Sequence, residues 1–227
     1  MTGQNVAVIV AHPDDEVLAF GGTMCRHAEL GDHVHVLFLA TGLAARTEDG
    51  RVAAEEFQKL RAEAREAGNL MGVEKIEFSD FPDNRMDTVP LLDVVKRVSA
   101  FIENTAATLV YTHHVGDLNI DHTIVARAVL TACRPTPGAQ VKRIYAGEIL
   151  SSSEYSLAQD RFRPSTYIGI DSYLDRKRDA LKCYTGEIRY WPHPRSIQAV
   201  AFQARMRGAE AGLEAAEALC LLREIWT

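Results

Sequence analysis

Two segments rich in histidine and aspartate follow directly after apolar stretches of this sequence. Residues 6–10 (VAVIV) lead into residues 11–16 (AHPDDE), and residues 107–112 (ATLVYT) lead into residues 114–122 (HVGDLNIDH). Such apolar runs are typical of buried strands, and open α/β sheets bind ligands at the carboxyl ends of their strands. Closely packed carboxylates repel one another unless a cation lies among them. The two segments therefore predict a shared site for a divalent metal.

A second interpretation of the first segment needs no metal. Asp14 and Asp15 suit the first turn of a helix that begins near Glu16, where acidic side chains complement the exposed N–H groups. A single His-x-x-Asp spacing is also common at protein surfaces. The recurrence of His and Asp after a second apolar run favours the metal site over this alternative.

The composition is that of a folded enzyme-sized domain. The 227 residues are 47% hydrophobic and 25% charged, which fits one α/β domain over residues 1–227. A net charge of −6 argues against a general nucleic-acid-binding protein. Because the N-terminal residues are strand-like and not basic and apolar, we expect no leader peptide, and no apolar run is long enough to suggest a membrane-spanning helix. The four cysteines form no Cys-x-x-Cys pair, so we expect reduced thiols in a cytoplasmic protein.

Strand-like and helix-like stretches alternate along the chain. The expected strands cover residues 6–10, 34–40, 76–78, 107–112, 141–150 and 167–170, and the expected helices cover 17–30, 51–71, 90–104, 122–133, 171–184 and 197–223. This alternation predicts a Rossmann-like, doubly wound, mostly parallel sheet with helices on both faces. The Gly21-Gly22 pair lies inside the first helix, where glycine lowers stability, and so predicts close packing there.

The motifs resemble those of a known enzyme family. Residues 11–16 look like the signature of the zinc-dependent N-deacetylases of the LmbE-like, or PIG-L, family, and residues 116–122 (GDLNIDH) match the second metal-binding segment of that family. Weaker resemblances lie at residues 61–63 (RAE), 81–84 (FPDN) and 192–196 (PHPRS). The resemblance thus extends over most of the chain.

Carried over position by position, the resemblance implies a ligand set and a base. His12, Asp15 and His122 would bind Zn²⁺, a combination that leaves an open position for water or substrate. Another divalent ion suits the same ligand types. Asp14 would be the general base, because zinc lowers the pKa of a bound water to about 7 and a neighbouring carboxylate can then take its proton.

One position departs from the family pattern. Several members have a histidine two residues before their Asp-His pair, and this chain has Asn119 there. An amide can donate a hydrogen bond to an oxyanion but cannot carry a positive charge. His193 is our candidate for the missing catalytic function, and a purely structural role is the alternative. Asp121 could orient a catalytic imidazole or the metal ligands, or cap a helix.

The family acts mostly on N-acetylated sugars, so we expect a small-molecule amino-sugar substrate. The candidate contact residues are Arg61, Asp83, Asn84, Arg85, Asp117, Asn119 and Arg195. Arginine suits phosphate and carboxamide oxygens, although several of these residues could equally brace surface loops. The apolar side chains of residues 197–223 fit either core packing or the interface of a homo-oligomer.

The sequence therefore predicts a zinc-dependent hydrolase that removes an N-acetyl or other acyl group from an amino sugar. Two alternatives stay open. The four aspartates of the two motifs would also suit a metal-dependent phosphohydrolase with two bridged ions, and a non-catalytic module could keep the metal or sugar site. A nicotinamide-binding domain is disfavoured because no Gly-x-Gly-x-x-Gly follows the first strand.

Overall fold

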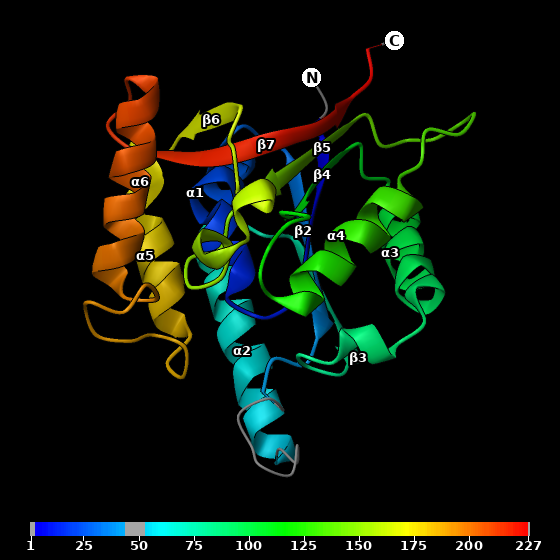
Figure 1. Ribbon diagram of the computed structural model, residues 1–227, viewed down its shortest axis with the longest axis horizontal. Coiled ribbons are helices and arrows are strands. Elements are labelled where there is room, and N and C mark those ends of the chain that lie inside the picture. Colours follow the sequence, from blue (N-terminus) through cyan, green and yellow to red (C-terminus); the bar gives the residue numbers. More distant parts are fainter. Residues whose placement is uncertain (1–2, 44–52, 227) are drawn as a thin grey trace.

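The computed structural model describes residues 3–43 and 53–226, and its centre is a seven-stranded sheet (Figure 1). The strand order is β3-β2-β1-β4-β5-β7-β6. The strands are β1 (Asn5–Val10), β2 (His33–Ala40), β3 (Lys75–Phe81), β4 (Leu109–His113), β5 (Arg143–Gly147), β6 (Thr166–Gly169) and β7 (Ala216–Glu224). Strands β1 to β5 pair in parallel, and β7 is antiparallel to both of its neighbours. The mostly parallel sheet predicted from the sequence is thus confirmed.

Helices cover both faces of this sheet. They are α1 (Asp15–Glu29), α2 (Ala54–Met71), α3 (Leu91–Thr105), α4 (Ile120–Ala132), α5 (Leu174–Cys183) and α6 (Ile197–Ala211). In β1, Val6, Val8 and Val10 pack in the same core as α1, α2, α5 and α6, whereas Ala7 and Ile9 pack with α3 and α4. Alternate residues of a strand point to opposite faces, so this apolar strand is buried on both sides. Figure 1 shows the helices on either side of the sheet.

The expected helix over residues 197–223 is wrong in its second half. Helix α6 ends at Ala211, Gly212 follows it at φ 71°, and β7 begins at Ala216. The sequence of β7, AEALCLLRE, consists largely of good helix formers. Its place between β5 and β6 overrides that propensity, because β7 pairs with both strands and its first four residues are buried. The other expected helices and strands lie within a few residues of the observed ones, and the expected helix start at Arg51 lies outside the described residues.

Close packing at the glycine pair of α1 is confirmed. A Cβ atom at Gly21 would lie 3.0 Å from the Lys177 side chain, and one at Gly22 would lie 2.6 Å from Ile170. Lys177 is itself buried, and its Nζ donates to Leu18 O of α1 and to Glu217. The glycines therefore allow α5 and the residue that follows β6 to approach α1.

The strand order reverses between β1 and β4, which are neighbours in the sheet although far apart in the sequence. This switch point opens a crevice at the carboxyl ends of the two strands. Helix α1 begins just beyond β1, and α4 begins seven residues after β4 ends at His113. Both histidine-containing segments therefore lie at the same edge. None of the helices in the described part of the chain has the length and apolar character that a membrane crossing needs.

Candidate metal centre

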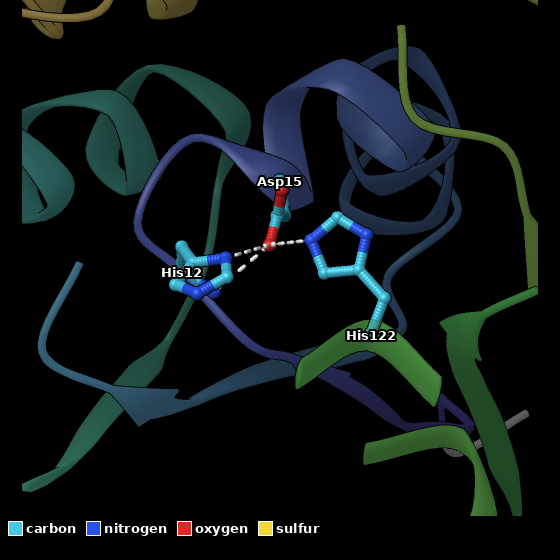
Figure 2. A group of neighbouring side chains, drawn as sticks. All are labelled: His12, Asp15 and His122. Carbon is cyan, nitrogen blue, oxygen red and sulfur yellow. Dashed lines mark hydrogen bonds and ion pairs between the residues drawn. The ribbon is translucent and has the colours of Figure 1, made fainter. Parts of the chain in front are cut away.

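His12, Asp15 and His122 lie together at this edge of the sheet (Figure 2). The Oδ2 atom of Asp15 is 3.3 Å from Nδ1 of His12 and 3.3 Å from Nε2 of His122. His12 follows β1, Asp15 is the first residue of α1, and His122 lies in the first turn of α4. All three side chains are buried. The structure thus brings together the three residues that the resemblance implied as ligands.

The donor atoms of this cluster suit a divalent cation. Nε2 of His122 and Oδ1 of Asp15 are buried without a hydrogen-bond partner. Burying an unpaired polar atom destabilises the fold unless an ion or a water molecule binds to it. Burial would raise the pKa of Asp15, but the two histidines hold it well below its ordinary value. Two imidazole nitrogens and one carboxylate form a donor set typical of catalytic zinc. The cluster therefore fits zinc in its residue types and in its unsatisfied atoms.

The outer nitrogen of each histidine faces another carboxylate. Nε2 of His12 is 3.0 Å from Oδ2 of Asp121 and 3.2 Å from Oδ1 of Asp83, and Nδ1 of His122 is 3.0 Å from Oδ1 of Asp117. Such carboxylates fix the tautomer and orientation of ligating imidazoles. Asp121 also accepts hydrogen bonds from the main-chain N–H groups of Asn84 and Met86 and so fastens the loop after β3.

His113, at the end of β4, supports the same cluster although its sequence gives no functional signal. Its Nε2 accepts a hydrogen bond from Ala11 N–H at 2.8 Å, and its ring stacks on that of His122 with centroids 4.0 Å apart. Burial lowers the pKa of His113 to about 3, so the imidazole is neutral. Adjacent strand residues point to opposite faces, so from the sequence at most one of His113 and His114 faces the site, and neither is predicted as a ligand.

Asp14 presents a carboxylate beside the cluster. Its side chain is almost completely buried, and Oδ2 accepts a hydrogen bond from Nη1 of Arg195 at 3.0 Å. Oδ1 is buried without a partner. Burial raises the pKa of Asp14 to about 7, against the opposing effect of the Arg195 charge. One carboxylate oxygen is therefore left available to a water or a substrate.

A cavity of about 70 Å³ opens at this point. It is lined by His12, Pro13, Asp14, Gly42, Asp83, Asn84, Asn119, Glu187 and Arg195. Four of the residues expected to contact substrate thus lie around it: Asp83, Asn84, Asn119 and Arg195. Glu187 is an addition that the sequence did not reveal, and its Oε2 accepts a hydrogen bond from Nη1 of Arg195 at 3.1 Å.

The structure places the other three expected contact residues elsewhere. Arg61 donates to Asp80 at 2.5 Å, and its guanidinium lies 5.2 Å from the centre of the Phe78 ring. Arg85 is exposed and does not line the cavity. Asp117 lies behind His122 and accepts hydrogen bonds from the hydroxyl groups of Ser152 and Ser153. Its contacts fit a role in orienting His122.

Asn119, which occupies the position of the family's histidine, and His193, the candidate to replace it, both have structural partners. Asn119 is the N-cap of α4, where its Oδ1 accepts from Asp121 and His122 N–H, and its Nδ2 donates to Asn84 at 3.1 Å. His193 is exposed, and its Nδ1 accepts from the main-chain N–H of Arg195 at 3.0 Å. It does not line the cavity. His193 therefore shapes the turn that presents Arg195.

A comparison with known protein families agrees with this geometry. Residues 7–133 match the family model described as "PIG-L: GlcNAc-PI de-N-acetylase". The chain belongs to the PIG-L family. In this PIG-L chain the match covers β1 to α4, and therefore all three residues of the His12, Asp15 and His122 cluster.

Individual relatives of this PIG-L chain include enzymes of two kinds. It is 29% identical to a 4-oxalmesaconate hydratase of Pseudomonas putida, over 85% of this chain and 78% of that protein. It is 25% identical to a probable N-acetyl-α-D-glucosaminyl L-malate deacetylase of Bacillus cereus, over 81% of this chain and 84% of that protein. Among solved structures, the 4-carboxy-2-hydroxymuconate hydratase GalB of P. putida superposes with a TM-score of 0.80 at 24% identity, over 100% and 98% of the two chains. The structural likeness shows the shared fold.

Proposed function

We propose that this protein is a zinc-dependent hydrolase that removes the N-acetyl group of an amino-sugar conjugate, and that residues 1–227 form one catalytic domain. The observation that supports it most is that the cluster leaves Nε2 of His122 unsatisfied, while Oδ1 of Asp14 is unpartnered at the cavity that His12 also lines. His12, Asp15 and His122 would hold the ion. Zinc, when bound, would polarise the amide carbonyl and acidify a water molecule.

The chain's own residues would handle the proton. Asp14 accepts a proton from the attacking water through Oδ1 and returns it to the departing nitrogen, because an amine leaves readily only when protonated. Arg195 holds the other oxygen of Asp14 in place. The Nδ2 group of Asn119 has a second N–H besides the one donated to Asn84 and can hydrogen-bond to the substrate.

The lining of the cavity favours a hydroxyl-rich ligand over a polyanion. Among the described lining residues, Arg195 is the sole Lys or Arg side chain, and it already pairs with Asp14 and Glu187. Asp83, Asn84 and Asn119 supply the carboxylate and amide groups that hydrogen-bond sugar hydroxyls. This distribution of charge supports a neutral sugar as the part of the substrate nearest the metal.

Hydration of an unsaturated acid is a second candidate, favoured by the hydratase relative that aligns with 85% of the chain. The same site could deliver water to a carbon–carbon double bond. A substrate with several carboxylates would, however, need cationic partners, and Arg195 is engaged. A two-metal phosphohydrolase has less support, because it needs a bridging carboxylate, whereas the residue that the two possible clusters share is a histidine, His12. A non-catalytic module would have no need of Asp14.

The test measures metal content and amine release together. Purified protein is assayed with a panel of N-acetylated sugars and sugar conjugates, before and after chelation and again after adding zinc. We expect the purified protein to contain metal. Amine release should stop when the metal is removed by chelation and should resume when zinc is added. Release of no amine, with metal-dependent loss of absorbance from an unsaturated dicarboxylic acid, would establish the hydratase instead. Failure to take up any divalent metal would exclude both.

A further inference from the structure

The main chain of Asp14 has an uncommon conformation. Its φ of 116° and ψ of −28° lie in the left-handed half of backbone space, where non-glycine residues are strained. Such strain persists only where the surroundings hold the residue in place, and it is frequent at functional sites. The question is therefore which groups hold Asp14.

A buried carboxylate bridges Asp14 to the C-terminal part of the chain. Oε2 of Glu16 accepts a hydrogen bond from the Asp14 main-chain N–H at 3.0 Å. Oε1 of the same carboxylate accepts a hydrogen bond from the hydroxyl of Tyr184. Glu16 and Tyr184 are both fully or almost fully buried. Neither contact involves the carboxylate of Asp14, so the bridge acts on its main chain.

Tyr184 directly follows α5 and begins the segment that also holds the Asp14 side chain. Its carbonyl accepts a hydrogen bond from Glu187 N–H at 3.0 Å, and Glu187 in turn pairs with Arg195. Arg195 then donates to Oδ2 of Asp14. Residues 184–195 are thus connected to Asp14 in two ways. Tyr184 reaches its main chain indirectly, through Glu16, and Arg195 binds its side chain directly.

We propose that Tyr184 and Glu16 are positioning residues, which hold the Asp14 main chain so that its free carboxylate oxygen faces the metal-side cavity. The inference rests on the proposed function in so far as Asp14 is the base. Tyr184 lies outside the residues 7–133 that match the family model. The C-terminal part of the chain therefore has a role of its own in this site, apart from the metal-binding motifs.

The kinetic test replaces one hydroxyl. Tyr184→Phe should lower kcat about 10- to 100-fold, because a small displacement of a reacting group is enough for such a loss. Its KM and zinc stoichiometry should stay unchanged. Tyr111→Phe is the matched control, since the buried Tyr111 hydroxyl pairs with His27, away from the site. It should lower the melting temperature without lowering kcat. Equal kcat in Tyr184→Phe and the wild type would overturn the proposal.

A double variant separates positioning from an independent effect. In an Asp14→Asn background, Tyr184→Phe should cause no further loss of the residual rate, because the residue it positions is already disabled. A further loss as large as that in the wild-type background would overturn the proposal. Full activity of Asp14→Asn itself would instead refute the assignment of the base within the proposed function.

A stability measurement needs neither substrate nor metal. Glycine tolerates the φ of residue 14 and alanine does not, so Asp14→Gly should melt at least about 2–4 °C above Asp14→Ala. Both variants lack the contact with Arg195, which cancels in the comparison. In a Tyr184→Phe background the difference should shrink, because the main chain can relax. An unchanged difference would show that Tyr184 does not hold this conformation.

Discussion

Two regions of the molecule build the candidate site in different ways. Residues 12–122 supply the metal cluster from the ends of neighbouring parallel strands and from the first turns of α1 and α4. Residues 184–195 supply the partners of Asp14 from a connection between α5 and α6 that has no regular secondary structure over most of its length. The first region fixes the cation, and the second fixes the base beside it.

This difference separates two kinds of functional information. Metal ligands must be particular residue types at particular distances, so they leave a pattern in the sequence. Partners of a base need only place a donor or acceptor correctly, and many residues and spacings can do that. Variants of the metal ligands and of the side chains that orient them, all in the first region, should therefore change metal binding. Variants of Asp14 and of its partners in the second region should change the rate alone.

The largest effect should come from the first region. His122→Ala removes a ligand atom that lies 3.3 Å from the Asp15 carboxylate, and activity should fall below detection with the loss of stoichiometric metal. Metal analysis of the purified variant checks this, with His193→Ala as a control that should keep its metal. Tight stoichiometric metal in His122→Ala would remove it from the ligand set.

Asp14→Asn should separate the two functions within one motif. The variant keeps the shape of the side chain but loses the base, so the rate of amine release should fall about 10²- to 10⁴-fold. Zinc stoichiometry should remain that of the wild type, because Asp14 is not among the clustered ligands. Parallel metal and rate measurements decide this, and a loss of metal equal to that of His122→Ala would make Asp14 a ligand.

Asp117→Asn should weaken metal binding without abolishing it. Its carboxylate is 3.0 Å from Nδ1 of His122, and loss of such a partner typically costs about 10- to 100-fold in metal affinity. Competition with a coloured chelator measures the affinity. Asp80→Asn is a suitable control, since Asp80 is exposed and pairs with Arg61 outside the cavity. Equal affinities in the two variants would contradict an orienting role for Asp117.

The smallest effect should come from the second region. Arg195→Met removes the donor to Oδ2 of Asp14, so kcat should fall by about tenfold while zinc affinity stays the same. Arg61→Met serves as the control because its guanidinium pairs with Asp80 away from the cavity lining. If Arg195→Met instead lost its metal, the proposed division between the two regions would fail.

Much of the first region could be predicted from the sequence. The apolar runs before His12 and before His114 predicted two buried strands, and therefore placed both motifs at one edge of the sheet. Both strands are indeed buried on both faces. Arg61 and Arg85 could not be placed, because nothing in a single sequence tells which way a loop arginine points. Arg61 instead lies over Phe78.

The second region could be predicted only in part. Arg195 stood out beside a proline-framed histidine, but Tyr184 and Glu187 gave no signal. The partner of Tyr184 is Glu16, 168 positions earlier, and Glu187 acts on Asp14 through Arg195. The strand β7 was hidden by its helix-forming composition. Sheet pairing decided its conformation, and pairing across such distances does not show in local propensity.

The place of β7 in the sheet also bears on how the protein assembles. Among the described strands, β6 pairs with β7 alone, and β7 follows β6 in the sequence. Residues 5–147 can form their five-stranded parallel sheet earlier during synthesis, but β6 cannot join until residues 216–224 have been made. We therefore expect the parallel part of the sheet, which carries His12, Asp15 and His122, to form before β6 and β7 complete the antiparallel edge.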